Sequence, residues 1–74
     1  MPTLLELKPG AQARVVRLDG ERTFRRRLME LGLLPGTTLR MVRSVPVGDL
    51  VELEVRGCHL SLRRGEAEQL WVEA

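Results

Sequence analysis

Apolar and polar residues alternate on both sides of the dipeptide Arg56-Gly57. A period of two is typical of a strand with one buried face, and glycine supplies the positive φ that a tight hairpin turn needs. A two-residue turn here pairs six inward-facing residues in register: Val55 with Cys58, Leu53 with Leu60, and Val51 with Leu62. A shift by one residue would turn all six side chains to water. The alternation therefore predicts one antiparallel hairpin with a fixed register.

The run Leu28–Gly36 predicts a helix that ends at Gly32 and is followed by a Pro-Gly corner. Glycine suits the left-handed position after a last helical turn, and a nearby proline forbids continuation. The two leucines of this exit, Leu33 and Leu34, are unusual because short connections normally run over the surface and are polar. They must pack beneath the helix or contact a partner.

Periodicity and turn signals place the other elements. Strands are expected at 11–18, 37–45 and 70–73, a helix at about 21–31, and a short helical turn at 64–69. Asp19-Gly20 offers N-cap chemistry for the helix. Five short strands with a turn near the end suggest a small barrel, which also removes exposed sheet edges.

The expected helix has two faces. At 100° per residue, Phe24, Leu28 and Leu31 form a narrow apolar stripe that should cover one end of the barrel. The opposite side carries three arginines and a methionine: Arg22, Arg25, Arg26 and Met29. An exposed methionine is either a flank of the core or a contact residue, since its side chain adapts to irregular surfaces.

The composition fits a small cytoplasmic domain. Cys58 has no second cysteine to pair with, which fits a reducing compartment. No stretch approaches the roughly 18 apolar residues of a membrane span, and no signal peptide is visible. Residues 14–43 hold eight arginines against three acids, whereas residues 44–74 hold three arginines against six acids. This asymmetry fits an acidic partner for the first half, or an arginine-rich face kept in solvent.

The residues that could carry chemistry are few. One histidine and no phosphate-binding loop give no catalytic constellation, so we expect no enzyme. Neighbours on a strand face opposite ways, so Cys58 is read as an inward structural residue and His59 as an outward one facing Glu54. His59 and Glu54 are therefore the two candidate metal ligands. Because two ligands are few, we expect no metal or cofactor to be bound by a single subunit. Trp71 is expected half-exposed, either under an arginine or at a contact between subunits or with a partner.

The chain resembles the FeoA family, small accessory proteins of bacterial ferrous iron transport, over nearly its whole length. The resemblance rests on four segments in order: 27–36 (RLMELGLLPG), 45–49 (VPVGD), 60–67 (LSLRRGEA) and 70–72 (LWV). Family members often carry proline after the Gly-Asp pair, where this chain has Leu50. The resemblance implies a single domain over residues 1–74, a mainly β, SH3-like barrel with a helical insertion. It also implies a role beside FeoB, a membrane iron transporter with a cytoplasmic GTP-binding domain.

We therefore expect a non-enzymatic docking module, cytoplasmic and held near the inner membrane by its partner without inserting into it. Arg22, Arg25 and Arg26 would steer it to an acidic surface. Met29, Leu33 and Leu34 would form the desolvated centre of the contact, where interfaces concentrate their energy. Of the two leucines, Leu34 is expected to point outward and Leu33 to lie under the helix.

Two alternatives come from other classes. An iron sensor or chaperone is limited by the missing ligand cluster. A nucleic-acid-binding barrel would explain eleven arginines but usually needs aromatic stacking platforms, and this chain has one Phe, one Trp and no Tyr. Self-association of the domain is left open.

Overall fold

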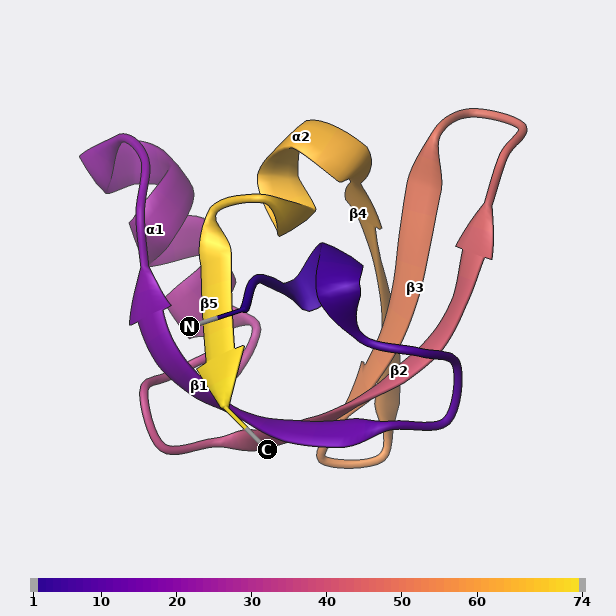
Figure 1. The fold of residues 1–74 in the computed structure, drawn as a ribbon. Helices are drawn as coiled ribbons and strands as arrows, with labels where there is room; N and C mark the ends of the chain where they lie inside the picture. The colour runs from indigo at the N-terminus through magenta and orange to yellow at the C-terminus, as the bar shows by residue number, and fades with distance from the viewer. Residues whose placement is uncertain (1, 74) are drawn as a thin grey trace.

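One curled antiparallel sheet forms most of the structure, a computed structural model that describes residues 2–73. Its strands are β1 (Gln12–Leu18), β2 (Thr38–Val45), β3 (Leu50–Val55), β4 (Cys58–Arg63) and β5 (Leu70–Glu73), in the spatial order β4-β3-β2-β1-β5. The helices are η1 (Leu4–Glu6, 3₁₀), α1 (Arg22–Glu30) between β1 and β2, and α2 (Arg64–Ala67) between β4 and β5. Figure 1 shows η1 and α2 inside the curl and α1 at its outer corner. The predicted mainly β, barrel-like fold with an inserted helix is confirmed, although the sheet does not close and β4 and β5 are its two outermost strands.

The β3–β4 hairpin has the predicted register. Val55 pairs with Cys58, Leu53 with Leu60 and Val51 with Leu62. Arg56 and Gly57 both have positive φ, 52° and 78°, as the two-residue turn that matches strand twist requires. The inward residues of β3 are almost completely buried, so the alternation did predict which face meets the core.

Helix α1 ends as predicted at Gly32, which has a φ of 100°. The Gly32 amide donates to the carbonyl of Met29 at 3.0 Å, and the Leu33 amide donates to that of Leu28 at 3.0 Å. These two bonds form a Schellman motif, which turns the chain back beneath the helix. Leu28 and Leu33 are consequently both 0% exposed and close one end of the core.

The apolar stripe expected on α1 is only partly confirmed. Leu28 is buried and Phe24 is half-buried, but Leu31 is 45% exposed. The reason is the Schellman turn: Leu33 returns under the helix and takes the buried position that periodicity assigned to Leu31. An ideal helical period does not continue through a residue that caps the helix.

Two other expectations about single residues are wrong. Asp19 does not cap α1, because the N-cap position is Glu21 and no side chain bonds there. The Asp19 amide instead donates to the carbonyl of Gln69 at 2.8 Å, which holds Asp19 against β5. Cys58 is paired as predicted but exposed, since it is the first residue after the turn and lies on an edge strand, beyond the end of the core.

The sequence analysis did not predict η1. Leu4 is 0% exposed and belongs to the core, and the preceding residues pair with β5. Thr3 bridges Trp71, and the Val72 amide donates to the carbonyl of Pro2 at 2.9 Å. The N-terminal segment therefore covers one edge of the sheet.

Within residues 2–73, no helix has the length and apolar character to cross a membrane.

Candidate protein-interaction surface

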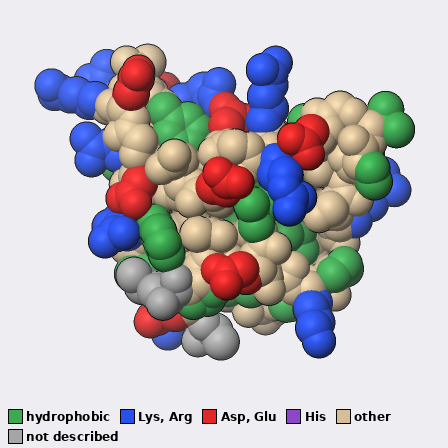
Figure 2. Space-filling view, turned by 45° about the horizontal axis from the view of Figure 1, so that its top comes forward, with side chains coloured by type: hydrophobic (Ala, Val, Ile, Leu, Met, Phe, Trp, Pro, Cys, Tyr) green, Lys and Arg blue, Asp and Glu red, His purple; other side chains and the backbone are tan. Residues whose placement is uncertain are grey.

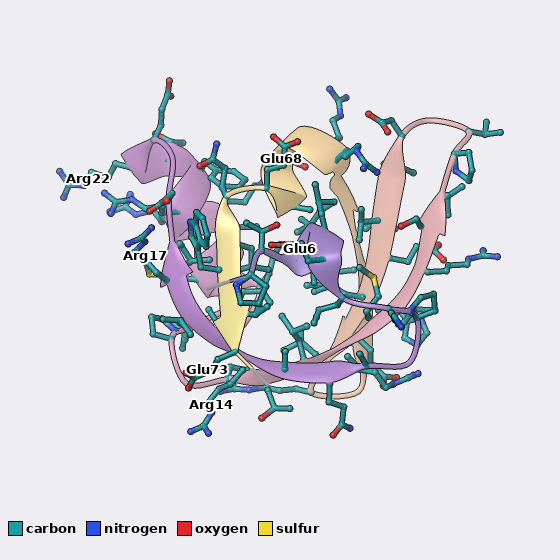
Figure 3. The ribbon with its side chains drawn as sticks, in the orientation of Figure 1. Glu6, Arg14, Arg17, Arg22, Glu68 and Glu73 are labelled. Atoms are coloured by element: carbon teal, nitrogen blue, oxygen red, sulfur yellow. The ribbon has the colours of Figure 1, made fainter. Side chains whose placement is uncertain are left out.

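The outer side of α1 presents four side chains at helical positions i, i+3, i+4 and i+7. We call them the arginine face: Arg22, Arg25, Arg26 and Met29. All four are exposed, Met29 at 39%, and Arg22 points away from the body of the protein (Figure 3). Together with Glu30 they line an open hollow of about 470 Å³. In Figure 2, Lys and Arg side chains gather at the upper left, where α1 lies. The structure thus brings together the three arginines and the methionine that the sequence singled out.

The arginines of this face differ from most others in the chain because no carboxylate within residues 2–73 neutralises them. Five other arginines form ion pairs with acidic residues: Arg14–Glu73, Arg17–Asp19, Arg27–Glu66, Arg40–Glu54 and Arg43–Glu52. None of the three arginines of the arginine face does so. Their guanidinium donors therefore remain available to an external acidic group.

An ion pair joins α1 to α2. Arg27 donates to Glu66, and the guanidinium of Arg27 also lies 5.7 Å from the centre of the Phe24 ring. Glu66 accepts a second bond, from the Arg63 amide at 2.9 Å. The bond from the Arg63 amide holds the pKa of Glu66 below its ordinary value, and the ion pair with Arg27 lowers it further by a smaller amount. Arg27 thus orients α1 and is not part of the free arginine face.

The exit from α1 divides its leucines between core and surface. Leu34 is 38% exposed, as expected for a contact residue, but Leu33 is fully buried. Leu33 lies under the helix, as expected of the residue directly after the helix end, and the Schellman turn holds it in the core, so it is not part of the exposed surface. Sequence reasoning also missed Leu31, which lines a hollow of about 750 Å³ with Leu50 and Leu62.

The outward side of β2, β3 and β4 carries two rows of polar side chains, which we call the ladder face. One row is Arg40–Glu54–His59 and the other is Arg43–Glu52–Ser61. In the first, Nε and Nη2 of Arg40 donate to Glu54 Oε1 at 3.1 and 3.0 Å. His59 Nε2 lies 3.2 Å from Glu54 Oε2. Each arginine of this face therefore meets a carboxylate on the neighbouring strand.

His59 and Glu54, the two predicted metal candidates, do lie side by side. Arg40, more than His59, holds the pKa of Glu54 below its ordinary value, and its guanidinium donates to Oε1 of the same carboxylate that His59 contacts through Oε2. Among residues 2–73, no three His, Cys, Asp or Glu side chains are grouped to hold a metal ion. Alone, this pair offers a cation two ligands, fewer than structural metal sites use.

Trp71 is half-buried and fixed on both sides. Arg17 lies 5.2 Å above its ring centre, as one interpretation of the sequence expected, and the indole Nε1 donates to Asp19 Oδ2 at 2.7 Å. Asp19 Oδ2 also accepts a hydrogen bond from Arg17 Nη2 at 3.3 Å, and Arg17 Nε lies 3.0 Å from Asp19 Oδ1 in the same ion pair. The three side chains join the end of β1 to β5, so Trp71 has a structural role that needs no partner.

A curled five-stranded sheet with a helix in its first long connection defines a small SH3-like domain. The model of the FeoA domain matches residues 3–74, and the chain belongs to the FeoA family.

Relatives support this assignment in sequence and in structure. The chain is 39% identical over 70 residues to a fusion of Fe(2+) transport protein A with the Fe(2+) transporter FeoB from Porphyromonas gingivalis, covering 95% of this chain but 8% of the fusion protein. The solution structure of FeoA from Chlorobium tepidum is 43% identical with a TM-score of 0.90, covering 97% of this chain and 69% of that one. FeoA from Stenotrophomonas maltophilia, a prokaryotic SH3 domain protein complexed with zinc, is 34% identical with a TM-score of 0.83, covering 99% and 91%.

Proposed function

We propose that this domain is a non-enzymatic accessory module of ferrous iron transport. It docks through α1 on the cytoplasmic GTP-binding part of a FeoB-type membrane transporter and modulates it from the cytoplasm. The observation that carries this proposal is the arginine face: three guanidinium groups without a carboxylate partner in residues 2–73, set around an exposed methionine.

The fused relative supports the choice of partner. In Porphyromonas gingivalis a segment similar to this chain is part of the same polypeptide as FeoB. Two domains joined in one chain experience a high effective concentration of each other, which favours contacts between them even when each contact is weak. A domain supplied separately must reach the transporter by diffusion, and uncompensated charge speeds that encounter.

The two kinds of side chain on this surface have different tasks. Arg22, Arg25 and Arg26 attract an acidic surface over a distance of about 8 Å at physiological ionic strength. Met29 and Leu34 act only after encounter, when their apolar area is removed from water. The arginines therefore set the association rate and its salt dependence, while Met29 and Leu34 set the lifetime of the complex.

The alternatives receive less support. A zinc-bound relative and the His59–Glu54 pair favour metal binding, but Arg40 competes for Glu54. Nucleic-acid binding by base stacking lacks platforms, because Arg27 lies over Phe24 and Arg17 over Trp71. Calorimetry with ferrous iron in the absence of oxygen tests the first alternative, and titration of a labelled oligonucleotide at two salt concentrations tests the second.

Surface-bound kinetics against the cytoplasmic part of a FeoB-type transporter tests the docking proposal. Replacing Arg22, Arg25 and Arg26 with glutamine should slow association and flatten its salt dependence. Replacing Leu34 with serine should leave association unchanged and speed dissociation by about tenfold, equivalent to about 1.4 kcal/mol. Circular dichroism of each variant verifies the fold.

The matched control is the double variant Arg40→Gln/Arg43→Gln, which also removes arginines but from the ladder face. It should associate at nearly the parent rate because those charges are already neutralised by Glu54 and Glu52. Equal slowing per arginine removed, three in one variant and two in the other, would mean that only net charge matters and that α1 is not the docking surface. Absence of binding by the parent domain would refute the proposal directly.

A further inference from the structure

One carboxylate lines the hollow of the arginine face. Glu30 borders this hollow of about 470 Å³ together with the three arginines and Met29, and its side chain is exposed. Arg26 precedes Glu30 by four residues and Arg27 by three, the two spacings at which helical side chains are neighbours. Neither arginine forms an ion pair with Glu30. Arg27 pairs with Glu66, and no ion pair of Arg26 is found within residues 2–73.

The order of the two residues along α1 accounts for the missing pair with Arg26. A glutamate four residues before a basic residue suits the helix dipole, whereas arginine before glutamate is the less favourable order. Glutamates elsewhere in the fold, such as Glu54 and Glu66, instead accept from an arginine on another element. The outer surface of α1 therefore carries free positive charge over its first turns and a free negative charge at its last residue.

An unneutralised glutamate beside three arginines is unfavourable for a uniformly acidic partner. Its charge opposes the steering that the arginines provide, because the potential at a surface is the sum of all nearby charges. It would also lie against partner carboxylates, and such like-charge contacts act against a wrong partner. A basic group opposite Glu30 turns the same charge into an attraction. Charge complementarity therefore favours a partner surface that is acidic with one basic group beside the acids.

We propose that Glu30 determines which acidic surfaces the arginine face accepts. The partner surface carries carboxylates opposite Arg22, Arg25 and Arg26 and one lysine or arginine opposite Glu30. At a helical rise of about 1.5 Å per residue, that basic group lies about 6 Å along the α1 axis from the carboxylate opposite Arg26 and about 12 Å from the one opposite Arg22. This inference rests on the proposed docking of α1 and adds what the transporter must present there.

A specific partner and an unspecific polyanion must then respond to Glu30 in opposite ways. The specific partner gains an ion pair from Glu30, of the modest strength that exposed pairs have. Heparin has acidic groups and no basic group, so it is only repelled by Glu30. Removal of this carboxylate should weaken the first interaction and strengthen the second, which a surface selected by net charge alone cannot do.

Surface-bound kinetics against the cytoplasmic part of a FeoB-type transporter, combined with heparin chromatography of the same variants, tests this inference. Glu30→Gln should bind the transporter about threefold more weakly, the size of an exposed ion pair, yet elute from heparin at higher salt than the parent. Glu30→Lys should bind the transporter about tenfold more weakly, because repulsion is added to the loss of the pair. Circular dichroism verifies the fold of each variant.

The matched control is Glu21→Gln. Glu21 is also exposed, forms no ion pair among the described residues and lies one helical turn from Arg25, but it does not line the hollow. Its side chain makes no capping bond to α1, so its substitution should leave the helix in place. Glu21→Gln should elute from heparin at higher salt, as Glu30→Gln does, and bind the transporter at least as tightly as the parent.

The outcomes separate this inference from the docking on which it rests. Unchanged or tighter transporter binding by Glu30→Gln would overturn the inference, because Glu30 would then face no basic group. Equal weakening by Glu30→Gln and Glu21→Gln would overturn it too, since the effect would not depend on position. In both cases, slower association after substitution of the three arginines would leave the docking proposal intact. A parent domain that does not bind the transporter would refute the docking and this inference together.

Discussion

The ladder face and the arginine face both carry arginines, but the surroundings of these arginines differ. On the ladder face, Arg40 and Arg43 each lie opposite a glutamate on the neighbouring strand. On the arginine face, Arg22, Arg25 and Arg26 have no carboxylate partner within residues 2–73. The first surface is electrostatically satisfied, while the second keeps its charge available for a partner.

The difference follows from local geometry. In an antiparallel sheet, directly opposite residues lie about 5 Å apart, so an arginine on one strand reaches a glutamate on the next. A short helix at the outer corner of the fold has no neighbouring element beside its outer face (Figure 1). Glu30 lines the same hollow, yet no ion pair found within residues 2–73 joins it to any of the three arginines. The number of arginines therefore indicates less about binding than the number left uncompensated.

The largest expected effect concerns the attachment of the arginine face. Leu28 is the one fully buried side chain of α1, so Leu28→Ala should lower the free energy of unfolding by about 3 kcal/mol. Urea unfolding followed by circular dichroism measures this. Leu34→Ala is the control, since an exposed leucine should cost less than about 1 kcal/mol. Similar losses for both variants would show that α1 is held by its exit and not by Leu28.

The second prediction concerns removal of the glutamates of the ladder face, which should leave its arginines as free as those of the arginine face. Glu52→Gln/Glu54→Gln should free Arg43 and Arg40, so the variant should need more salt to elute from a heparin column than its net charge alone explains. The control Glu6→Gln/Glu68→Gln has the same net charge, breaks no ion pair found within residues 2–73 and leaves the arginine face unchanged. The Glu52/Glu54 variant should lose only little stability, since exposed ion pairs contribute little. Elution of both variants at the same salt concentration would contradict the comparison.

The third prediction concerns the link between α1 and α2. The pKa of Glu66 in the folded state lies below its ordinary value of 4.5. Its carboxylate therefore stabilises the fold above the unfolded-state pKa, and this contribution is lost as the pH falls through the folded-state pKa. Glu66→Gln should cost about 1 kcal/mol at pH 7. The difference between parent and variant should shrink below about pH 4.5.

Urea unfolding at several pH values between 7 and 3 measures this third effect. Glu68→Gln, a neighbouring exposed acid, should show no comparable convergence. A constant difference across the pH range would mean that the charge of Glu66 does not contribute.

The smallest effect is expected at Cys58. Because its side chain is exposed, Cys58→Ser should change the free energy of unfolding by less than about 0.5 kcal/mol. The folded parent should react with a thiol reagent as quickly as the chain in denaturant, after correction for the denaturant. Strong protection of the thiol in the native protein would restore the structural role that the sequence suggested.

Prediction succeeded where a local pattern and the tertiary environment agree. The register of β3 and β4 follows from the alternation of apolar and polar residues and from the turn at Arg56-Gly57. Both features lie within one hairpin. The end of α1 follows from Gly32 for the same reason, because a Schellman motif is formed by neighbouring residues. In each case the residues that make the bonds are close in sequence.

Prediction failed where a residue's environment is set by distant segments. The sequence could not show that Asp19 bonds to Trp71, because the two are brought together only when β1 pairs with β5. Nor could it place Leu4 in the core, since a single turn of 3₁₀ helix has no periodicity to detect.

By itself, the sequence determined the order of the five strands and of α1 and α2, the register of one hairpin, the end of α1 and the set of arginines on its outer face. These depend on side-chain period and turn chemistry, which act over a few residues. Only the tertiary structure decided which arginines keep their charge free, which leucines of the α1 exit are exposed, and which sheet edge the N-terminal segment covers. Those properties depend on which groups lie close to each residue in the folded protein. A carboxylate, the core or the N-terminal segment comes close to these residues only when the sheet curls.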